Sequence, residues 1–216
     1  MIRNIIFDFD GTLADTARGI VATEREVLRR LGLPQTSEAQ MCSTIGLPLG
    51  ESLRLACNLP DALVDKAVRM YRDLFFDYAP QHIVIFEGVK ETLAALKDRG
   101  IRMAIATSRG RDSLEKILEV HGMDAWFEAD LTADDGIRPK PNPDMVLELM
   151  ARMGLRAEET LVVGDTTFDL EMGKAARCRT VGVSYGNHSR ERLATASPDW
   201  IIDRFDALRE IIGGRR

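Results

Sequence analysis

Two aspartates, Asp8 and Asp10, stand at the end of an apolar run near the start of the chain, immediately before Gly11. Side chains alternate along a strand, so residues two apart would leave the strand on the same side. Two carboxylates at that spacing repel each other unless a cation lies between them or one of them takes up a proton. A capped turn accounts for one aspartate before a glycine, but not for both. The pair therefore predicts a cation site, acid–base chemistry, or both.

A hydroxyl-rich segment, Thr107-Ser108-Arg109-Gly110, follows a second apolar run. A hydroxyl group and free backbone amides at the start of the next helix would suit a phosphate group. The same residue types are also ordinary helix caps, and on this segment alone we favour capping.

A lysine, Lys140, stands between Pro139 and Pro141, and Pro143 follows shortly before a predicted helix. The prolines confine the direction of the lysine, and Pro143 suits the first turn of a helix. An isolated lysine is usually solvated, but the prolines and the place before a helix favour a functional role here.

Asp165 leaves a third apolar run, and Asp169 follows four residues later. If a helix begins between them, the two side chains lie on one face. Hard cations such as Mg²⁺ prefer carboxylate and carbonyl oxygens. Helix capping would explain Asp169, which the helix dipole would favour, but it gives Asp165 no purpose.

The elements that must position these segments alternate between helix and strand from residue 88 onward. Helical patterns cover 89–97, 111–121, 142–153, 170–176 and 205–212, and apolar strands cover 102–106, 160–163, 180–184 and 199–202, with a short strand or loop over 126–131. This alternation predicts an α/β fold with a mostly parallel, doubly wound sheet. Ligands bind at the carboxyl ends of the strands in such sheets, which is where the polar segments lie.

An all-helical stretch separates the first strand from this alternating region, with helical patterns over 16–31, 37–44, 51–57 and 61–78. We therefore expect residues 1–15 and 84–216 to form an α/β core, and residues 16–83 to form an inserted helical domain. The insert leaves and re-enters the core near Asp15 and Phe86, next to the acidic turn. That placement favours a mobile lid over a site, and a rigidly docked helical subdomain is the alternative.

The 216-residue chain has a net charge of −5 and 45% hydrophobic residues, which is typical of a soluble globular protein. The acidic balance gives no reason to expect a nucleic-acid partner, and no apolar run is long enough to span a membrane. The cysteines lack metal-site spacing and the first residues lack a signal-peptide pattern, so we expect a cytoplasmic protein with reduced thiols. No apolar stripe beyond the core faces indicates an oligomeric interface.

Taken together, the four segments resemble the four motifs of the haloacid dehalogenase superfamily and occur in the same order, from Asp8 to Asp169. The stretch that begins at Asp8 is similar to the first motif, DxDGT, and the chain is most similar to the phosphoglycolate phosphatase-like branch. This resemblance implies a Rossmann-like core with an inserted helical cap. It also implies a Mg²⁺-dependent phosphatase that acts on a small phosphorylated metabolite.

The resemblance implies a role for each matching residue. Asp8 would be the nucleophile that attacks phosphorus and becomes an aspartyl phosphate, and Asp10 would protonate the leaving oxygen and then activate water. Thr107 would bind the transferring phosphoryl group together with the Ser108 amide. Lys140 would neutralise charge on the nucleophile and on the phosphoryl oxygens.

The resemblance also implies a Mg²⁺ site built from acidic residues. Asp165 would be a metal ligand, with Asp169 as its partner, directly or through water. The ion would also take a carboxylate oxygen of Asp8 and the backbone carbonyl oxygen of Asp10.

In this superfamily the helical cap would set substrate specificity. The loop that begins at Gly46 resembles the substrate-facing cap loop, and Arg54 would reach a substrate carboxylate or second phosphate unless it is a surface arginine. The alternatives are an inorganic pyrophosphatase or a sugar phosphomutase of the same superfamily, although the mutase branch has a histidine soon after the first motif where this chain has Arg18-Gly19-Ile20. A phosphorylation-activated regulatory module is the non-enzymatic alternative, but such modules are shorter and have no helical insert.

Overall fold

The computed structural model describes residues 1–79 and 82–213 of the chain. At its centre is a six-stranded sheet in the order β5-β4-β1-β6-β7-β8, in which all neighbours are parallel. The strands are β1 (Asn4–Phe7), β4 (Arg102–Ala106), β5 (Ala129–Leu131), β6 (Thr160–Gly164), β7 (Arg179–Val183) and β8 (Trp200–Ile202). The sheet confirms the predicted α/β fold. Residues 80–81 of the expected insert and 214–216 of the expected core lie outside the described residues.

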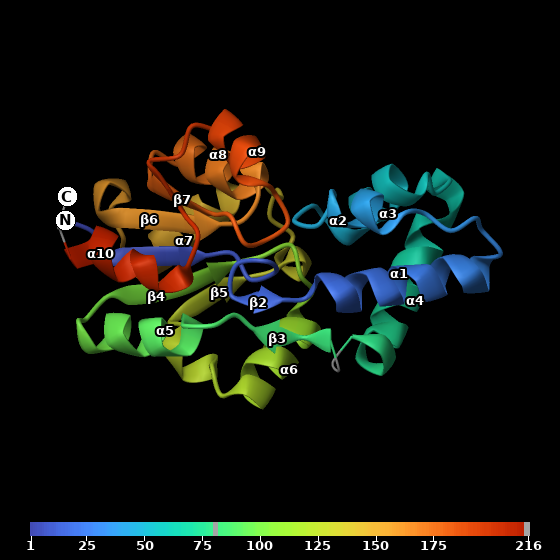
Figure 1. Ribbon diagram of the computed structural model, residues 1–216, viewed down its shortest axis with the longest axis horizontal. Helices are drawn as coiled ribbons and strands as arrows, with labels where there is room; N and C mark the ends of the chain where they lie inside the picture. The colour runs from blue at the N-terminus through green and yellow to red at the C-terminus, as the bar shows by residue number, and fades with distance from the viewer. Residues whose placement is uncertain (80–81, 214–216) are drawn as a thin grey trace.

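Helices cover both faces of the sheet (Figure 1) because its central strand is apolar on both sides. On one face, Ile5 and Phe7 belong to a cluster with residues of α5 (Val89–Asp98), α6 (Arg111–His121) and α10 (Leu208–Gly213). On the other face, Ile6 belongs to a cluster with residues of α7 (Asp144–Met153) and α8 (Thr167–Ala175). A last helix, α9 (Arg190–Thr195), packs beside α8 and β7.

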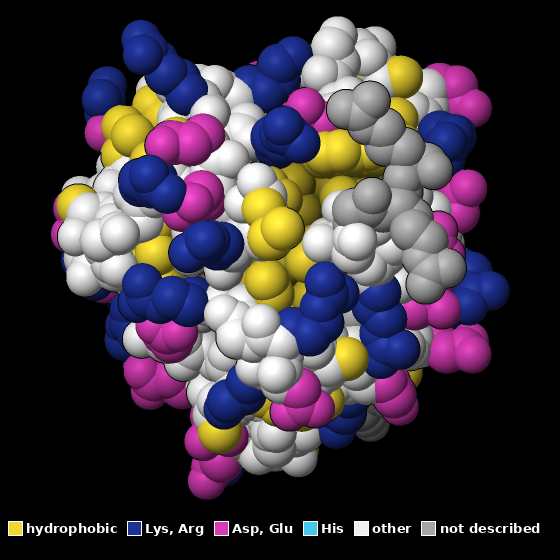
Figure 2. Space-filling model, turned by 90° about the vertical axis from the view of Figure 1, so that its left-hand side faces the viewer, with side chains coloured by type: hydrophobic (Ala, Val, Ile, Leu, Met, Phe, Trp, Pro, Cys, Tyr) yellow, Lys and Arg dark blue, Asp and Glu magenta, His cyan; other side chains and the backbone are white. Residues whose placement is uncertain are grey.

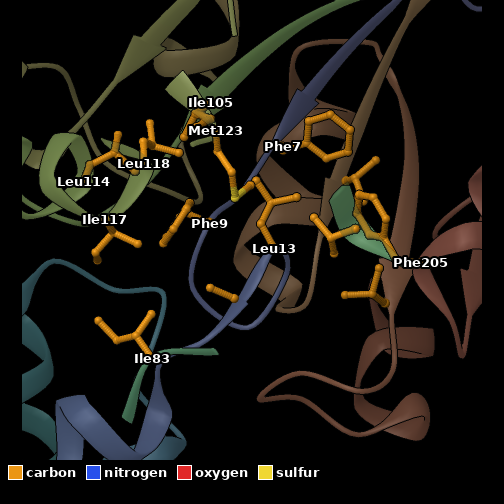
Figure 3. Packing of buried hydrophobic residues seen from close by; sticks show 14 of the residues in the cluster. Phe7, Phe9, Leu13, Ile83, Ile105, Leu114, Ile117, Leu118, Met123 and Phe205 are labelled. Carbon is orange, nitrogen blue, oxygen red and sulfur yellow. The ribbon is translucent and has the colours of Figure 1, made fainter. Parts of the chain in front are cut away.

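Figure 3 shows part of the first cluster, which extends well beyond the sheet. Phe7 lies against Phe205, with the ring centroids 5.7 Å apart. The same cluster continues through Phe9 and Leu13 to Ile83, at the junction with the helical insert. The turn that carries Asp8 and Asp10 is therefore anchored by apolar residues on both sides.

The inserted segment folds into α1 (Ala17–Leu31), α2 (Glu38–Cys42), α3 (Leu49–Cys57) and α4 (Asp61–Tyr78). These are the helices that the sequence predicts. Helix α4 packs along α1 and against α3. In Figure 1 the four helices lie together at one end of the sheet, beyond the carboxyl ends of its strands. We call residues 16–83 the cap segment.

Two short strands join the cap segment to the sheet, and the sequence did not indicate them. β2 (Ala14–Asp15) pairs antiparallel with β3 (Val84–Ile85), with Ala14 opposite Ile85 and Asp15 opposite Val84. Strands of two residues carry no periodicity that a pattern can reveal. This ribbon brings the two connections between the sheet and the cap segment to one place.

Several helices begin a few residues from their predicted starts. Helix α8 begins at Thr167 rather than at residue 170, because the Thr166 side chain caps it and Asp169 completes a capping box. Helix α3 begins at Leu49 and α7 at Asp144, each directly after a proline. Short 3₁₀ helices fill the connections at η2 (Asp124–Trp126), η3 (Ala133–Asp135), η4 (Ala157–Glu159) and η5 (Phe205–Ala207).

Figure 2 looks onto the end of the molecule where the strands begin, opposite the cap segment. Basic and acidic side chains are interspersed there, and neither sign gathers into one large patch on the visible surface. Across the described part of the chain, no helix has both the length and the apolar character needed to cross a membrane.

Candidate active site

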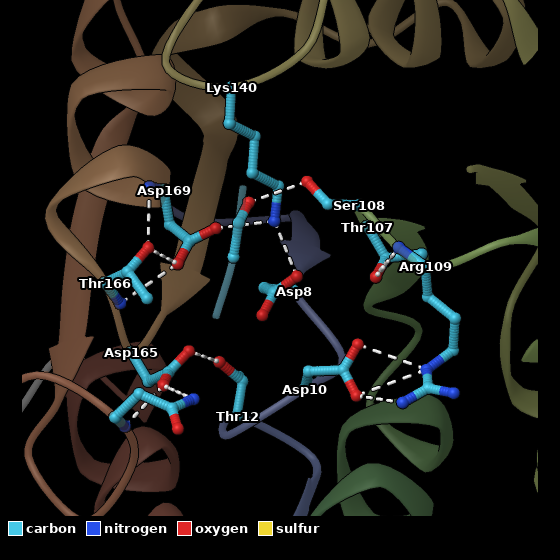
Figure 4. A network of polar contacts seen from close by, with 12 residues as sticks. Asp8, Asp10, Thr12, Thr107, Ser108, Arg109, Lys140, Asp165, Thr166 and Asp169 are labelled. Atoms are coloured by element: carbon cyan, nitrogen blue, oxygen red, sulfur yellow. Dashed lines mark hydrogen bonds and ion pairs between the residues drawn. The ribbon is translucent and has the colours of Figure 1, made fainter. Parts of the chain in front are cut away.

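The four polar segments meet at one edge of the sheet because the strands that precede them are parallel neighbours. The amide of Asp8 donates to the carbonyl of Val163 at 2.9 Å, which continues the pairing of β1 with β6. The amide of Thr107 likewise donates to the carbonyl of Leu131 at 2.9 Å, one residue beyond β4. Asp165 directly follows β6. The structure thus brings together side chains that are far apart in the sequence (Figure 4).

Lys140 lies between two buried carboxylates. Its Nζ donates to Asp8 Oδ1 at 2.5 Å and to Asp169 Oδ1 at 2.6 Å, and the side chains of all three residues are almost fully buried. Burial disfavours the ammonium, but Asp169 and Asp8 outweigh it and raise the pKa of Lys140. Burial also raises the pKa of Asp8 well above its ordinary value, although Lys140 opposes that shift. A lone lysine would not tolerate this environment, so these partners explain why it is buried.

Asp8, Asp165 and Asp169 form a cluster of buried carboxylates that fits a metal ion. One oxygen atom from each of them lies within 4.8 Å of the others. Asp8 Oδ2 is buried and has no hydrogen-bond partner among the described residues, and a buried polar atom of that kind calls for a partner. Burial, with Asp169 nearby, raises the pKa of Asp165 to about 7. Three carboxylate oxygens are the donor set that Mg²⁺ prefers.

Asp165 is held by residues that the sequence did not single out. Its Oδ1 accepts from Thr12 Oγ1 at 3.2 Å, and its Oδ2 accepts from the Asn187 amide at 2.6 Å and from Asn187 Nδ2 at 2.8 Å. Asn187 follows β7, so its place after a strand end was the available signal. Gly11 has a φ of +78°, and a Cβ there would overlap the Asp165 carboxylate, so glycine lets the turn approach this closely.

Asp169 both caps a helix and takes part in the acidic cluster. Its Oδ2 accepts from the Thr166 amide at 3.0 Å and from Thr166 Oγ1 at 2.7 Å, while its Oδ1 accepts from Lys140. The two interpretations of this residue are therefore compatible, because each uses a different oxygen atom.

Asp10 points away from the acidic cluster and is held by Arg109. The guanidinium Nη2 donates to Asp10 Oδ1 at 2.5 Å and Nε donates to Oδ2 at 3.1 Å, while Thr16 Oγ1 donates to Oδ1 at 2.5 Å. Burial disfavours the charged guanidinium, but Asp10 outweighs it and raises the pKa of Arg109. No local pattern indicates a separate role for Arg109, because its partner lies 99 residues away.

Besides the bond from Thr16 to Asp10, the cap segment contacts the site through residues of its loop and of α4. Ser108 Oγ donates to the carbonyl of Gly46 at 2.7 Å, so a predicted phosphate-binding residue meets the predicted cap loop. The guanidinium carbon of Arg109 lies 4.7 Å from the centre of the Phe75 ring on α4. Arg72, also on α4, pairs with Asp134 at 2.5 Å.

A cavity of about 310 Å³ lies between the cap segment and the sheet. Asp8, Asp10, Thr107, Ser108 and Gly46 all line it. Arg54 does not line it: its guanidinium pairs with Asp61 at 2.6 Å on the surface. The position of Arg54 therefore gives no support to the substrate contact expected from the sequence.

Comparisons with known proteins agree with this geometry. A family model described as haloacid dehalogenase-like hydrolase matches residues 5–183. The chain is 41% identical to the probable phosphatase IndB of Dickeya dadantii, over 97% of this chain and 91% of that protein. It is 34% identical to the phosphoglycolate phosphatase of Pectobacterium atrosepticum, over 98% and 93% of the two chains. It is 31% identical to the pyrophosphatase PpaX of Bacillus velezensis, over 98% and 97%.

Solved structures give the same result for the fold. A protein from Bacteroides fragilis superposes with a TM-score of 0.92 at 31% identity, covering 96% of this chain and 100% of that one. The parallel sheet, the helical layers and the inserted helices are therefore shared with a solved relative over almost the whole chain.

Proposed function

The chain belongs to the haloacid dehalogenase-like hydrolase family and is a phosphatase, and we propose that it hydrolyses a small phosphate monoester with Mg²⁺ through an aspartyl-phosphate intermediate. The observation that carries this proposal is Asp8. It is a buried carboxylate with one oxygen bound to Lys140 at 2.5 Å and the other free of any hydrogen-bond partner among the described residues. Lys140 therefore fixes the orientation of this carboxylate, and no described residue occupies its second oxygen.

In the first step, an oxygen atom of Asp8 bonds to phosphorus as the bond from phosphorus to the leaving oxygen breaks. Asp10, in its protonated form, gives its proton to that leaving oxygen. In the second step, water attacks phosphorus and gives a proton to Asp10, and the bond from phosphorus to Asp8 breaks. Arg109 and Thr16 hold the carboxyl group of Asp10 in place for both proton transfers.

Positive charge and fixed donors stabilise the transferring group in this proposal. Lys140 neutralises charge on Asp8 and on the phosphoryl oxygens, and Thr107 with the Ser108 amide binds the phosphoryl group. Asp8, Asp165 and Asp169 would hold Mg²⁺, together with the backbone carbonyl of Asp10. When bound there, the ion supplies further positive charge against the phosphoryl oxygens.

Residues 16–83 act as a cap domain that closes the site, and their contacts with the site support this. The link from Ser108 to Gly46 and the pair of Arg72 with Asp134 are both polar contacts across the cavity. Contacts of this kind form and break at low cost as a lid moves. We also propose a cytoplasmic location, which the free thiols of Cys42, Cys57 and Cys178 support.

An organic phosphate ester fits the cavity better than inorganic pyrophosphate does. Apolar side chains of the cap segment, including Val68, Phe75 and Phe76, line it above Asp8. An apolar wall favours a carbon-containing leaving group over a bare phosphate. The relatives named phosphoglycolate phosphatase support this class, and the relatives named pyrophosphatase keep pyrophosphate as the second candidate. A sugar phosphomutase would give no net phosphate release, and the phosphatase relatives support neither that nor a regulatory module.

The test is phosphate release from a panel of phosphorylated metabolites with Mg²⁺ present. Asp8→Asn should abolish turnover and keep the fold, because it removes the charge but little of the volume. Asp73→Asn, at an exposed position of α4, is the matched control and should keep wild-type activity. Wild-type rates in Asp8→Asn would refute the mechanism.

A further inference from the structure

Glu24, on α1 of the cap segment, is a buried carboxyl group without a partner. The residue is 0% exposed, and neither carboxyl oxygen has a hydrogen bond among the described residues. Glu24 lines the same cavity as Asp8. A buried carboxyl with no partner costs free energy, and native proteins seldom retain one without a reason.

The surroundings of Glu24 leave it free to meet a ligand. Ser52 is the polar side chain that faces Glu24, where it slightly lowers the pKa of the carboxyl, and its hydroxyl already shares a hydrogen bond of 2.7 Å with Thr44. Apolar residues Ile20 and Val68 line the same cavity. A polar group in an otherwise apolar wall fixes the orientation of a ligand that enters the cavity.

The cavity holds no free cation at this end. Two basic residues are among the described residues that line it, Arg72 and Arg109, and each is already paired, with Asp134 and Asp10 respectively. A leaving group with its own negative charge would have to break one of these pairs or lie in the cavity without a cation to balance its charge. Either event costs binding free energy.

We propose that Glu24 is a specificity-determining residue that selects phosphate esters whose leaving group presents a hydroxyl or amino group and carries no negative charge. This rests on the proposed function, since the phosphate must sit at Asp8 for its leaving group to reach α1. The preferred substrates are esters of polyols, sugars or amino alcohols. Phosphoglycolate, whose leaving group carries a carboxylate, is a poor substrate.

The free carboxyl is suited to both kinds of donor. Burial raises the pKa of Glu24 to about 8, so at neutral pH without ligand it is an uncharged acid that can accept and donate hydrogen bonds. A hydroxyl group of the substrate forms hydrogen bonds with this uncharged acid directly. A cationic amine stabilises the ionised form, which then pairs with it.

The experiment compares matched phosphate esters that differ only at the end of the leaving group. The two-carbon set is ethyl phosphate, 2-hydroxyethyl phosphate, O-phosphoethanolamine and phosphoglycolate. The five-carbon set is pentyl, 5-hydroxypentyl and 5-aminopentyl phosphate with 5-phosphonooxypentanoate. In at least one set, the hydroxyl or amino ester should exceed both the alkyl and the carboxylate ester in kcat/KM, by about tenfold to a hundredfold for a hydrogen bond to a buried carboxyl.

Two variants test whether Glu24 causes the preference. Glu24→Leu removes the carboxyl and fills the space, so the ratio of donor ester to alkyl ester should fall to about one. Glu24→Gln keeps an acceptor but cannot ionise, so it should retain the hydroxyl preference and lose the amino preference. Glu26→Gln, on the same helix but outside the cavity lining, should keep the wild-type ratios.

The outcomes separate this proposal from the proposed function. If wild-type protein hydrolyses p-nitrophenyl phosphate in an Asp8-dependent way but prefers the carboxylate esters, the role of Glu24 is refuted and the phosphatase mechanism stands. If Glu24→Leu keeps the wild-type ratio of donor ester to alkyl ester, the role of Glu24 is likewise refuted and the phosphatase mechanism stands. If no ester in either set, nor p-nitrophenyl phosphate, releases phosphate, both proposals fail.

Discussion

Glu24 should make the protein less stable as the pH rises, and Glu24→Gln should remove that dependence. Burial raises the pKa of Glu24 in the folded protein to about 8, from an ordinary value of 4.5. Between these values the folded chain holds a proton that the unfolded chain has released. The stability from this group is therefore fully present below pH 4.5 and is lost as the pH rises toward 8.

The size of the effect follows from the shift. Each pH unit between the two pKa values removes about 1.4 kcal/mol from the free energy of unfolding. From pH 5 to pH 8 the wild-type protein should therefore lose about 3–4 kcal/mol more than Glu24→Gln does, slightly less than three full pH units would give because the group is half titrated at pH 8. That is a large part of the 5 to about 15 kcal/mol typical of folded proteins.

The assay is urea denaturation of both proteins at intervals between pH 5 and pH 8. The buried amide of Glu24→Gln shifts stability by a constant amount, so the difference in slope against pH is the quantity to measure. Other groups with shifted pKa values are common to both proteins and cancel in that difference. Glu51→Gln, at an exposed position of α3, should follow the wild-type slope. Equal slopes in wild type and Glu24→Gln would refute the buried, unpartnered state of this carboxyl.

Three further outcomes are expected. Lys140→Met leaves Asp8 and Asp169 buried without their shared cation, so kcat should fall by about a hundredfold or more and stability by about 3–5 kcal/mol; phosphate release and denaturation measure both, and a wild-type kcat would contradict the role of the lysine. A chelator should stop phosphate release and added Mg²⁺ should restore it, whereas full activity in the chelator would exclude the metal site. Gly46→Ala strains a residue whose φ is +102° and places a Cβ 3.1 Å from the Thr166 side chain. KM should therefore rise, and stability should fall by about 1–3 kcal/mol. Gly32→Ala, with a φ of +67° and no neighbour within 4 Å, should lose stability alone, and equal KM changes in both variants would contradict a role for the loop.

The central strands of the sheet could be predicted because they are apolar runs with almost complete burial, whereas β5 is a partly buried edge strand that contains Asp130 and was predicted only as a short strand or loop. That signal lies within a few consecutive residues, as in Ile5 to Phe7. The β2–β3 ribbon could not be predicted, since two residues show no period and the partner strands are far apart in sequence. Its existence depends on where the cap segment leaves and returns.

The candidate site was predictable where a residue follows a strand end, as with Asp8, Thr107 and Asp165. Arg109 and Asn187 also follow strand ends, but their roles depend on partners in distant segments that no local pattern encodes.

Glu24 precedes the charged residues Arg25 and Glu26 in the sequence, which favours an exposed position on its helix. The structure buries it, because α1 packs against α4 on one side and borders the cavity on another. A helix with two buried faces cannot be recognised from one apolar stripe.

The β2–β3 ribbon affects how the cap segment of this enzyme can be replaced during evolution. Asp15 and Val84 are direct partners across the ribbon, so the chain returns to the point from which it departed. Directly opposed residues in an antiparallel pair lie only about 5 Å apart, a gap that a short turn can close. A different cap segment would therefore begin and end at the same place, beside the six-stranded sheet. A different cap segment would change the specificity that we propose for Glu24, while the carboxylates that follow β1 and β6 would keep their places.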